Sequence, residues 1–431
     1  MRAGKRDFVL LLVLLCTGTP NPARGDDVPG PGTLEVLLQR AYDNNGAIRA
    51  ARAGAEAAGA RAGHAGALPG PQLRATTFVV PIETRVGPQW FSLSLSQRFP
   101  WFGKLRTRTR IADRAAEVAA IRADARIRDV LVEVKLAWFE LHYLTRALEI
   151  VRENGEIARH IVEFGTAAYA RDEVPFYDIQ RARAEMARLI YDEVRLQDLA
   201  AVQVARLRAL LGGEDAGEIA SPGPLPFLEM RLPLDELTEL ALGHRLELDA
   251  AAVVVDGAED GVRLARKDYW PDLVVGLSWM AQEEKGSAPD AGKDAFGITV
   301  GFDLPVWAWS VDDRVDEASA RVREARETLR DGRARTRAEV VERTVALVDA
   351  ARLIGLYRGT LLPQARAALE SAETESREGR SLGALLERKA LWLRFRLAEQ
   401  RALADYYEAV ARLEQIVSVP LPLTRPTEEM P

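Results

Sequence analysis

The sequence predicts a mainly α-helical, internally duplicated fold in which long antiparallel coiled-coil helices carry a small β part of four strands. A repeat in the sequence leads to this prediction. A pair of strands closed by a proline and followed by a long helical stretch occurs twice, with Pro71 and Pro271 lying 200 positions apart and Pro100 and Pro305 lying 205 apart. Such a repeat is far longer than a solenoid unit, so we interpret it as a duplicated half-molecule. Two strands in each half cannot bury themselves alone, and the strands therefore need partners.

The N-terminus is expected to be a secretory signal peptide over residues 1–25. Basic Arg2, Lys5 and Arg6 precede an apolar run over 8–15, and Gly25 ends a small-residue pattern suited to cleavage. Cys16, the only cysteine, lies inside this segment, so a disulfide framework and a thiolate metal site are excluded from the mature chain. Lipid attachment at Cys16 is the alternative, and it is disfavoured because Leu15 is not a small residue.

The bulk charge argues against a nucleic-acid partner. Residues 1–25 hold four basic residues and one acidic residue, so their removal changes the formal net charge from −6 to about −9. An acidic chain without a basic patch binds nucleic acid poorly. After the signal, no run of about 18 apolar residues predicts a transmembrane helix.

The helical pattern sets the predicted organisation. The first repeat, 26–221, contains helices over 33–66, 101–164 and 175–211; the second, 222–419, contains helices over 234–267, 306–378 and 380–417; a tail follows over 420–431. Ile127, Leu131, Val134, Trp138 and Leu141 follow alternating steps of four and three residues, which indicates a coiled-coil seam. Pro363 is expected to break or kink its helix.

The strands are predicted over 72–80, 90–99, 272–280 and 295–304. Apolar and small polar residues alternate along 90–97 and 296–303, which is a strand signal. For any one strand taken alone, a half-buried sheet of a soluble protein is the favoured explanation of the alternation. The aromatic residues favour a membrane barrel, because they gather at two levels eight or nine residues apart, like aromatic girdles. Trp101, Phe102, Tyr269, Trp270, Trp307 and Trp309 lie at the helix-side level, and Trp90, Trp279 and Phe296 at the loop-side level.

The order of helix, hairpin, long helix and return helix, present twice, resembles the TolC-like outer-membrane factors of tripartite efflux systems. The segment LSQRFPWFGKL (95–105) is similar to the strand-to-helix junction of the heavy-metal and multidrug subgroup, and LLPQARAALE (361–370) to the proline-bearing helix of its second half. EFGTAAY (163–169) and REGRSLGALL (377–386) stand where that family has its helix–helix tips. The chain departs from the family at Val162 and Ser376, where aromatics are frequent, and in the extra residues 170–175.

The resemblance implies a passive channel-tunnel for small molecules or metal ions in the outer membrane of a Gram-negative bacterium, extending into the periplasm. It implies a homotrimer with a 12-stranded barrel, a periplasmic adaptor protein and an inner-membrane pump as partners, and no cofactor. The expected junction residues are Pro100, Gly103, Lys104 and Pro305. The residues expected to face lipid are Phe91, Leu93, Leu95, Leu273, Val275, Leu277, Phe296, Ile298, Val300 and Phe302. The expected tip and adaptor contacts are Gly165, Thr166, Gly379, Arg380, Ser381 and Leu382.

Charged residues near these tips allow two interpretations. Glu156, Glu163, Glu373, Glu375 and Glu378 could ring a cation-selective entrance, which Arg159, Arg171, Arg377 and Arg380 could hold shut. An ordinary solvated helix face is the simpler reading of each single residue.

Signals for enzyme chemistry are thin. GRSLG (379–383) matches a nucleophile elbow in letters, but a charged helical stretch precedes it where that elbow needs a strand. The four histidines have no metal-ligand spacing, and no phosphate-binding glycine loop occurs, so we expect no enzyme and no metal site. A periplasmic adaptor or a structural coiled-coil protein of the cell envelope remains the alternative function.

Overall fold

The structure is a computed structural model that describes residues 33–172, 174–213, 219, 222–285, 289, 291–377 and 382–425. The expected signal peptide with Cys16, the tip residues Gly379, Arg380 and Ser381, and Glu378 lie outside the described residues. The chain forms two compact units. We call the unit made of Arg52–Arg122 and Glu247–Gly332 the sheet unit, and the unit made of Met1–Ala51, Ala123–Leu246 and Arg333–Pro431 the helical unit.

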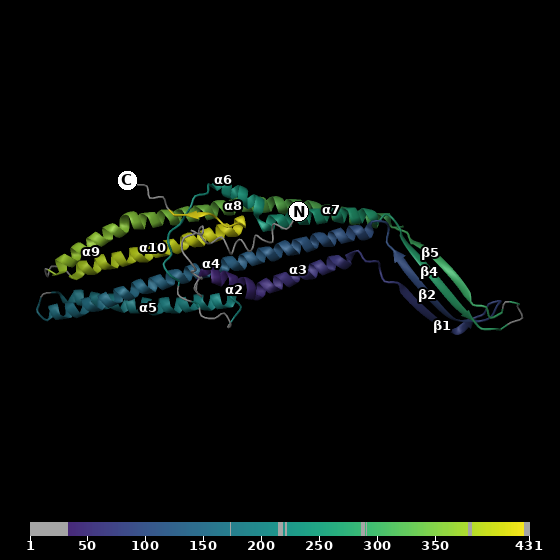
Figure 1. Ribbon diagram of the computed structural model, residues 1–431, viewed down its shortest axis with the longest axis horizontal. Helices are drawn as coiled ribbons and strands as arrows, with labels where there is room; N and C mark the ends of the chain where they lie inside the picture. Colours follow the sequence, from purple (N-terminus) through teal and green to yellow (C-terminus); the bar gives the residue numbers. More distant parts are fainter. Residues whose placement is uncertain are drawn as a thin grey trace, which may run out of the picture. The chain divides into compact units, whose positions relative to one another are not determined.

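The sheet unit is built around one antiparallel sheet. Its strands are β1 (Gln72–Ile82), β2 (Gln89–Phe99), β4 (Asp272–Gln282) and β5 (Ala295–Asp303), in the order β1-β2-β4-β5 (Figure 1). Each repeat contributes one hairpin, and the two hairpins join through β2 and β4. Strands β1 and β5 are therefore left at the two edges, each with one side of its backbone unpaired.

Helices of both repeats complete the sheet unit. They are α3 (Gly46–Ala65) from residue 52, α7 (Leu246–Lys267) from residue 247, and the first parts of α4 (Lys104–Tyr169) and α8 (Ala308–Leu356). Chain segments between strand and helix are short, since β2 ends at Phe99 and α4 begins at Lys104.

The helical unit contains two helical hairpins. In the first, the later part of α4 returns as α5 (Phe176–Leu210); in the second, α9 (Leu362–Arg377) returns as α10 (Leu382–Val417) (Figure 1). Helices α2 (Leu34–Asn44) and α6 (Leu234–His244) pack onto a core that includes Leu131, Leu403 and Tyr406, all almost fully buried. None of the helices in the described part of the chain combines the length and the apolarity needed to cross a bilayer.

The mainly α, duplicated fold class is confirmed, but the helices predicted as single over 33–66 and 234–267 are each broken in two. The breaks fall at equivalent positions, Asn45 and Arg245, where the backbone is extended rather than helical. At Asn45 the side-chain oxygen accepts hydrogen bonds from the backbone N–H groups of Ala47 (2.8 Å) and Ile48 (3.1 Å), so it caps the new helix α3. This capping was not anticipated.

Of the two expectations for Pro363, a break or a kink of its helix, the break does not occur. The chain passes from α8 into a single π-helical turn, η3 (Tyr357–Leu361), and continues as α9 from Leu362. Proline lacks an N–H group and its ring collides with the carbonyl one turn earlier. A wider turn before the proline removes this collision while the helix continues.

One small sheet was missed. Residues Glu229–Met230 (β3) pair antiparallel with Leu423–Thr424 (β6), where no strand was predicted. Two residues are too few for an alternation signal, and the pairing joins chain segments almost 200 residues apart. Tyr406 secures it, because its hydroxyl accepts a hydrogen bond of 2.8 Å from the backbone N–H of Met230.

Replacing Asn45 tests the helix break. Asn45 is buried, and its amide also donates a hydrogen bond of 2.7 Å to the carbonyl of Leu210 at the end of α5. Asn45→Ala removes the cap and leaves that carbonyl without its partner, so we expect the free energy of unfolding to fall by about 2 kcal/mol. Chemical denaturation followed by circular dichroism measures it. Asn45→Ser keeps a capping oxygen but cannot reach Leu210, and it should lose about half as much; equal losses would contradict the capping role.

Candidate functional site

The strand register separates the sheet into an apolar face and a polar face. Residues paired across antiparallel strands share a face. The pairs Leu95–Leu277 and Leu277–Ile298 therefore place these leucines and the isoleucine together. The same register places all ten residues expected to face lipid on this one face, which we call the apolar face: Phe91, Leu93, Leu95, Leu273, Val275, Leu277, Phe296, Ile298, Val300 and Phe302.

The opposite face, which we call the polar face, has mostly small and hydroxyl side chains, with Val274 and Met280 toward its two ends. Its central members are Thr76, Ser92, Ser94, Ser96, Gly276, Ser278, Gly297, Thr299 and Gly301. Every serine of β2 lies here because the alternation of period two is unbroken from Ser92 to Ser96. A sheet that buries one face in a compact soluble core would hide the apolar face and expose this one.

Much of the apolar face is exposed in the described part of the chain. Phe296 is 82% exposed and Ile298 78%, and Val300 and Phe302 are also exposed. An apolar surface of this extent on a soluble monomer is unusual and marks contact with a partner or a membrane. The described residues of this chain supply no element that packs over these four side chains.

Aromatic side chains lie at both ends of the sheet. At the loop end, Phe91 meets Trp279 edge-on, with ring centroids 6.0 Å apart. At the helix end, Trp101 stacks on Trp270 with centroids 5.1 Å apart and ring planes 7° apart. Phe102, Trp307 and Trp309 near that end are exposed. Trp101 and Trp270 come from different repeats, so the stack joins the two halves of the chain.

Lys104 holds the strand-to-helix junction together. This first residue of α4 is only 5% exposed, and its ammonium group lies 2.8 Å from a carboxylate oxygen of Asp272 and 3.3 Å from one of Asp268. The same Asp272 oxygen accepts a hydrogen bond of 2.9 Å from the backbone N–H of Trp101. A buried lysine is tolerated because two carboxylates neutralise it. The junction therefore links the start of α4 to the start of β4 in the other repeat.

Gly103 is required by the turn that leads into α4. Its φ of +79° lies in the left-handed region, which side chains with a Cβ adopt at a cost. A Cβ there would also lie 2.9 Å from the Lys267 ammonium nitrogen. Pro100 and Pro305 each follow the last residues of a strand, after β2 and β5 respectively. The four expected junction residues therefore lie at the junctions between strand and helix. The sequence did not indicate that Asp268 and Asp272 are the partners of Lys104.

The ends of the two helical hairpins pack together. Ile161, Ala182, Leu369, Ala372, Leu385 and Leu386, from α4, α5, α9 and α10, form one buried cluster. Gly165 is buried and Thr166 exposed in the last turns of α4, where the Thr166 hydroxyl donates to the Val162 carbonyl (2.7 Å). Leu382 begins α10. No contact with a partner is described for these tip residues, so their role stays a prediction.

The acidic residues near the tips are partly paired. Arg159 pairs with Glu156 one turn away on the same helix at 2.6 Å, and Lys389 lies 3.9 Å from Glu373. Glu163 is exposed. The Arg159 pair is an exposed contact within one helix, which favours the solvated-face interpretation for Glu156 over an entrance lock.

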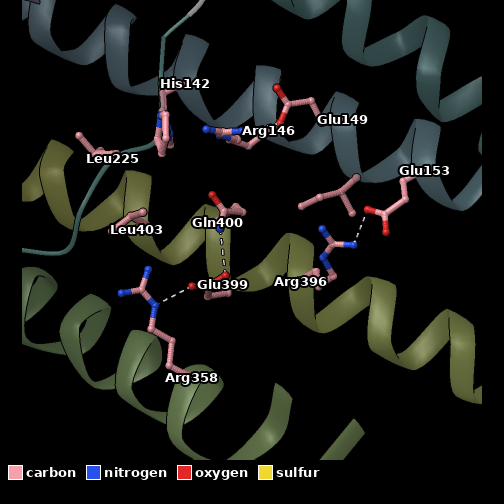
Figure 2. Close-up of a pocket in the computed structure, with 12 residues that line it drawn as sticks. His142, Arg146, Glu149, Glu153, Leu225, Arg358, Arg396, Glu399, Gln400 and Leu403 are labelled. Carbon is pink, nitrogen blue, oxygen red and sulfur yellow. Dashed lines mark hydrogen bonds and ion pairs between the residues drawn. The ribbon is translucent and has the colours of Figure 1, made fainter. Parts of the chain in front are cut away.

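A polar cavity of about 390 Å³ lies within the helical unit. Figure 2 shows His142, Arg146 and Glu153 of α4 facing Arg396, Glu399 and Gln400 of α10, with Arg358 reaching in from η3. The arginines here have carboxylate partners: Arg358 pairs with Glu399 at 2.6 Å, Arg396 with Glu153 at 2.7 Å and Arg146 with Glu149 at 2.6 Å. Charges of both signs balance, which suits a water-filled space between packed helices more than an anion site.

His142 is the exception in this cavity. It is 1% exposed, and neither ring nitrogen makes a hydrogen bond of normal geometry in the described part of the chain, although the backbone of Gly223 approaches the ring. Burial lowers the pKa of His142 below its ordinary value, and the charge of Arg146 lowers it further; Glu149 and the backbone of Gly223 act in the opposite direction but by less. His142 is therefore neutral at neutral pH. The sequence around His142 has no metal-ligand spacing and therefore predicts no role for it.

Groups that could bind a metal are absent from the described residues: no three His, Cys, Asp or Glu side chains are gathered suitably. The GRSLG segment lies mostly outside the described residues, and the helix α9 precedes it.

Comparison with known proteins gives a consistent picture. The family model described as "Outer membrane efflux protein" matches residues 37–213 and 237–418. Among solved structures, the chain is similar to CusC, with 15% identity, a TM-score of 0.77 and coverage of 89% of this chain and 91% of that one. It is also similar to VceC of Vibrio cholerae, with 20% identity, a TM-score of 0.75 and coverage of 90% and 96%. It is similar as well to the outer-membrane channel OprN, with 20% identity, a TM-score of 0.77 and coverage of 89% of each chain. No curated protein gives a significant match.

Removing Lys104 tests the junction. Lys104→Met leaves the partly buried Asp272 without its cation, whereas Asp268 keeps Arg314 at 3.2 Å. We therefore expect the free energy of unfolding to fall by about 3 kcal/mol. Thermal unfolding of the detergent-solubilised protein measures it. The double variant Lys104→Met/Asp272→Asn should recover part of the loss because a neutral amide needs no counter-charge. Simple additivity of the two single variants would contradict a direct interaction.

Acidification tests His142. The pKa of His142 is lowered in the folded state, so near pH 6.5 the unfolded chain takes up a proton at this residue and the folded chain does not. The free energy of unfolding therefore decreases as pH falls below about 6.5. His142→Phe removes this titration, and the cavity has room for the ring. We expect unfolding temperatures of wild type and variant to diverge between pH 7.5 and pH 5.5, with wild type losing more. Parallel pH profiles would show that His142 does not contribute.

Proposed function

We propose, from the premise that the chain belongs to the outer membrane efflux protein family, that three copies of it close into one continuous channel. The protein is an outer-membrane channel-tunnel of a tripartite efflux system, located in the outer membrane of a Gram-negative bacterium and extending into the periplasm.

One observation carries the proposal: a sheet with one apolar face and two open edges. Adjacent strands alternate in direction from β1 to β5, so β5 of one copy can pair antiparallel with β1 of the next. Open edges in lipid would leave backbone groups without hydrogen bonds, and only closure of the ring removes them. Four strands are too few to enclose a lumen, whereas three copies supply twelve, within the range of known barrels.

The face assignment follows from this closure. The apolar face, with Phe296, Ile298 and Val300, turns toward lipid, and the polar face lines the lumen. The aromatic residues at both ends of the strands then lie at the two membrane–water interfaces. Trp101 and Trp270 mark the periplasmic level, where the strands meet the helices.

Exposed apolar stripes on the helical unit support assembly. On α5, Tyr191, Val194 and Val202 are exposed, and on α8, Val341, Val345 and Val348 follow one another in steps of four and three residues. These stripes lie on different helices, so α5 of one copy against α8 of the next gives a head-to-tail contact. Such a contact closes into a ring when the rotation fits, here by a third of a turn.

The partners of the family remain proposals for this chain. We expect a periplasmic adaptor and an inner-membrane pump to meet the hairpin ends at Gly165, Thr166 and residues 379–382. The buried cluster of Ile161, Leu369 and Leu385 supports this, because it fixes the two hairpin ends together as one rigid surface. The earlier alternative, an adaptor or structural coiled-coil protein, is not supported by the family assignment.

Adjacent residues of β5 test which face meets lipid. Val300 lies on the apolar face opposite Val275, and Thr299 lies on the polar face opposite Gly276. A cationic side chain at the lipid-facing midplane costs about 2–4 kcal/mol. Val300→Arg should therefore abolish the heat-resistant trimer band and the outer-membrane fraction, whereas Thr299→Arg should retain both. Loss of the trimer in both variants, or in neither, would contradict the face assignment.

A further inference from the structure

The strands of the sheet contain four charged residues, and all four lie on the polar face. They are Arg74 on β1, Arg98 on β2, Asp272 on β4 and Asp303 on β5. Three of them are neutralised within the chain. Arg98 lies 3.1 Å from Asp303, and Asp272 lies 2.8 Å from Lys104. Arg74 is exposed and has no ion pair with any described residue.

Arg74 is also set apart from the other three in position. Its neighbours across the sheet are Ser94, then Ser278, then Gly297. Ser278 and Gly297 each lie six residues along their strands from Asp272 and Asp303, which is about 20 Å at about 3.3 Å per residue. The paired charges therefore gather at the helix end of the sheet, and Arg74 stands alone among the smallest side chains.

The surroundings leave the guanidinium group free to act on solutes. Serine and glycine neighbours offer no carboxylate and little bulk, so the side chain can extend away from the sheet. A strand β5 from the next copy brings no unpaired carboxylate either, because Asp303 is its one acidic residue and that residue pairs with Arg98.

We propose that Arg74 determines the charge selectivity of the strand-built part of the channel. This inference rests on the proposed trimer, in which three copies place three guanidinium groups around the lumen. A ring of like charges raises the local concentration of ions of opposite sign and opposes ions of its own sign. The lumen at this level therefore favours anionic solutes and small anions over cations.

The magnitude follows from screening. In a lumen as wide as twelve strands allow, the charges act across water and are screened beyond about 8–10 Å at 0.1–0.15 M salt. We therefore expect a moderate bias, with Arg74 raising the ratio of chloride to potassium permeability roughly twofold at 0.1 M salt. The bias should nearly vanish at 1 M salt, where the screening length is about 3 Å.

Reversal potentials of the full-length trimer in planar bilayers test this inference. Under a KCl gradient, Arg74→Gln should halve the chloride preference, Arg74→Glu should shift it further toward potassium, and the charge-conserving Arg74→Lys should leave it unchanged. Ser94→Gln, on the neighbouring strand, controls for side-chain volume and should change conductance without changing selectivity. An unchanged reversal potential in Arg74→Gln and Arg74→Glu would overturn the proposal.

Chemical modification gives a second readout at the same position. The mature chain is expected to contain no cysteine, so Arg74→Cys introduces a single thiol. A cationic methanethiosulfonate reagent should restore the chloride preference of that channel, and an anionic reagent should reverse it. Absence of any effect from either reagent would place Arg74 outside the lumen and overturn the proposal. Failure of the trimer itself would appear differently, as a wild-type protein that forms no trimer and no conducting channel.

Discussion

A single constraint explains most of this structure: the four-stranded sheet cannot satisfy either its edges or its apolar face within one chain. Strands β1 and β5 each leave one side of the backbone unpaired, and Phe296 and Ile298 lie open on the surface. Both needs are met at once by identical neighbours in lipid, because neighbours pair the edges and lipid covers the face. The helices are subject to the same condition, since α5 and α8 also keep apolar stripes exposed.

The features that follow a local period were predictable from sequence. The duplicated order of helix, hairpin and long helices, with the alternation around Leu93 and Ser94 and the junction residues Gly103 and Lys104, predicted the fold class and the family, and both are confirmed. The outer-membrane channel function is confirmed with them. The division into repeats over 26–221 and 222–419, the lipid-facing residues and the tip contacts stay predictions.

What the sequence could not supply are contacts between distant segments. The sequence around Asp272 does not indicate its role, because its ion-pair partner Lys104 lies 168 residues away in the chain. The sequence predicts Asn45 inside a helix, whereas in the structure its side chain caps α3 and donates a hydrogen bond to the carbonyl of Leu210. The π-helical turn before Pro363 was not predicted, since a wider turn leaves no mark in composition.

The ion pair at the junction also bears on how the duplicated gene can vary. Its cation stands in the first repeat and its two anions in the second, and the first repeat has Leu68 and Gln72 at the positions that match Asp268 and Asp272. Six copies of the first repeat alone would surround each Lys104 with leucine and glutamine, so a buried ammonium group would have no carboxylate. The two repeats are thus complementary and not interchangeable. A ring built from six identical repeats, in place of three chains with two repeats each, would lack this ion pair.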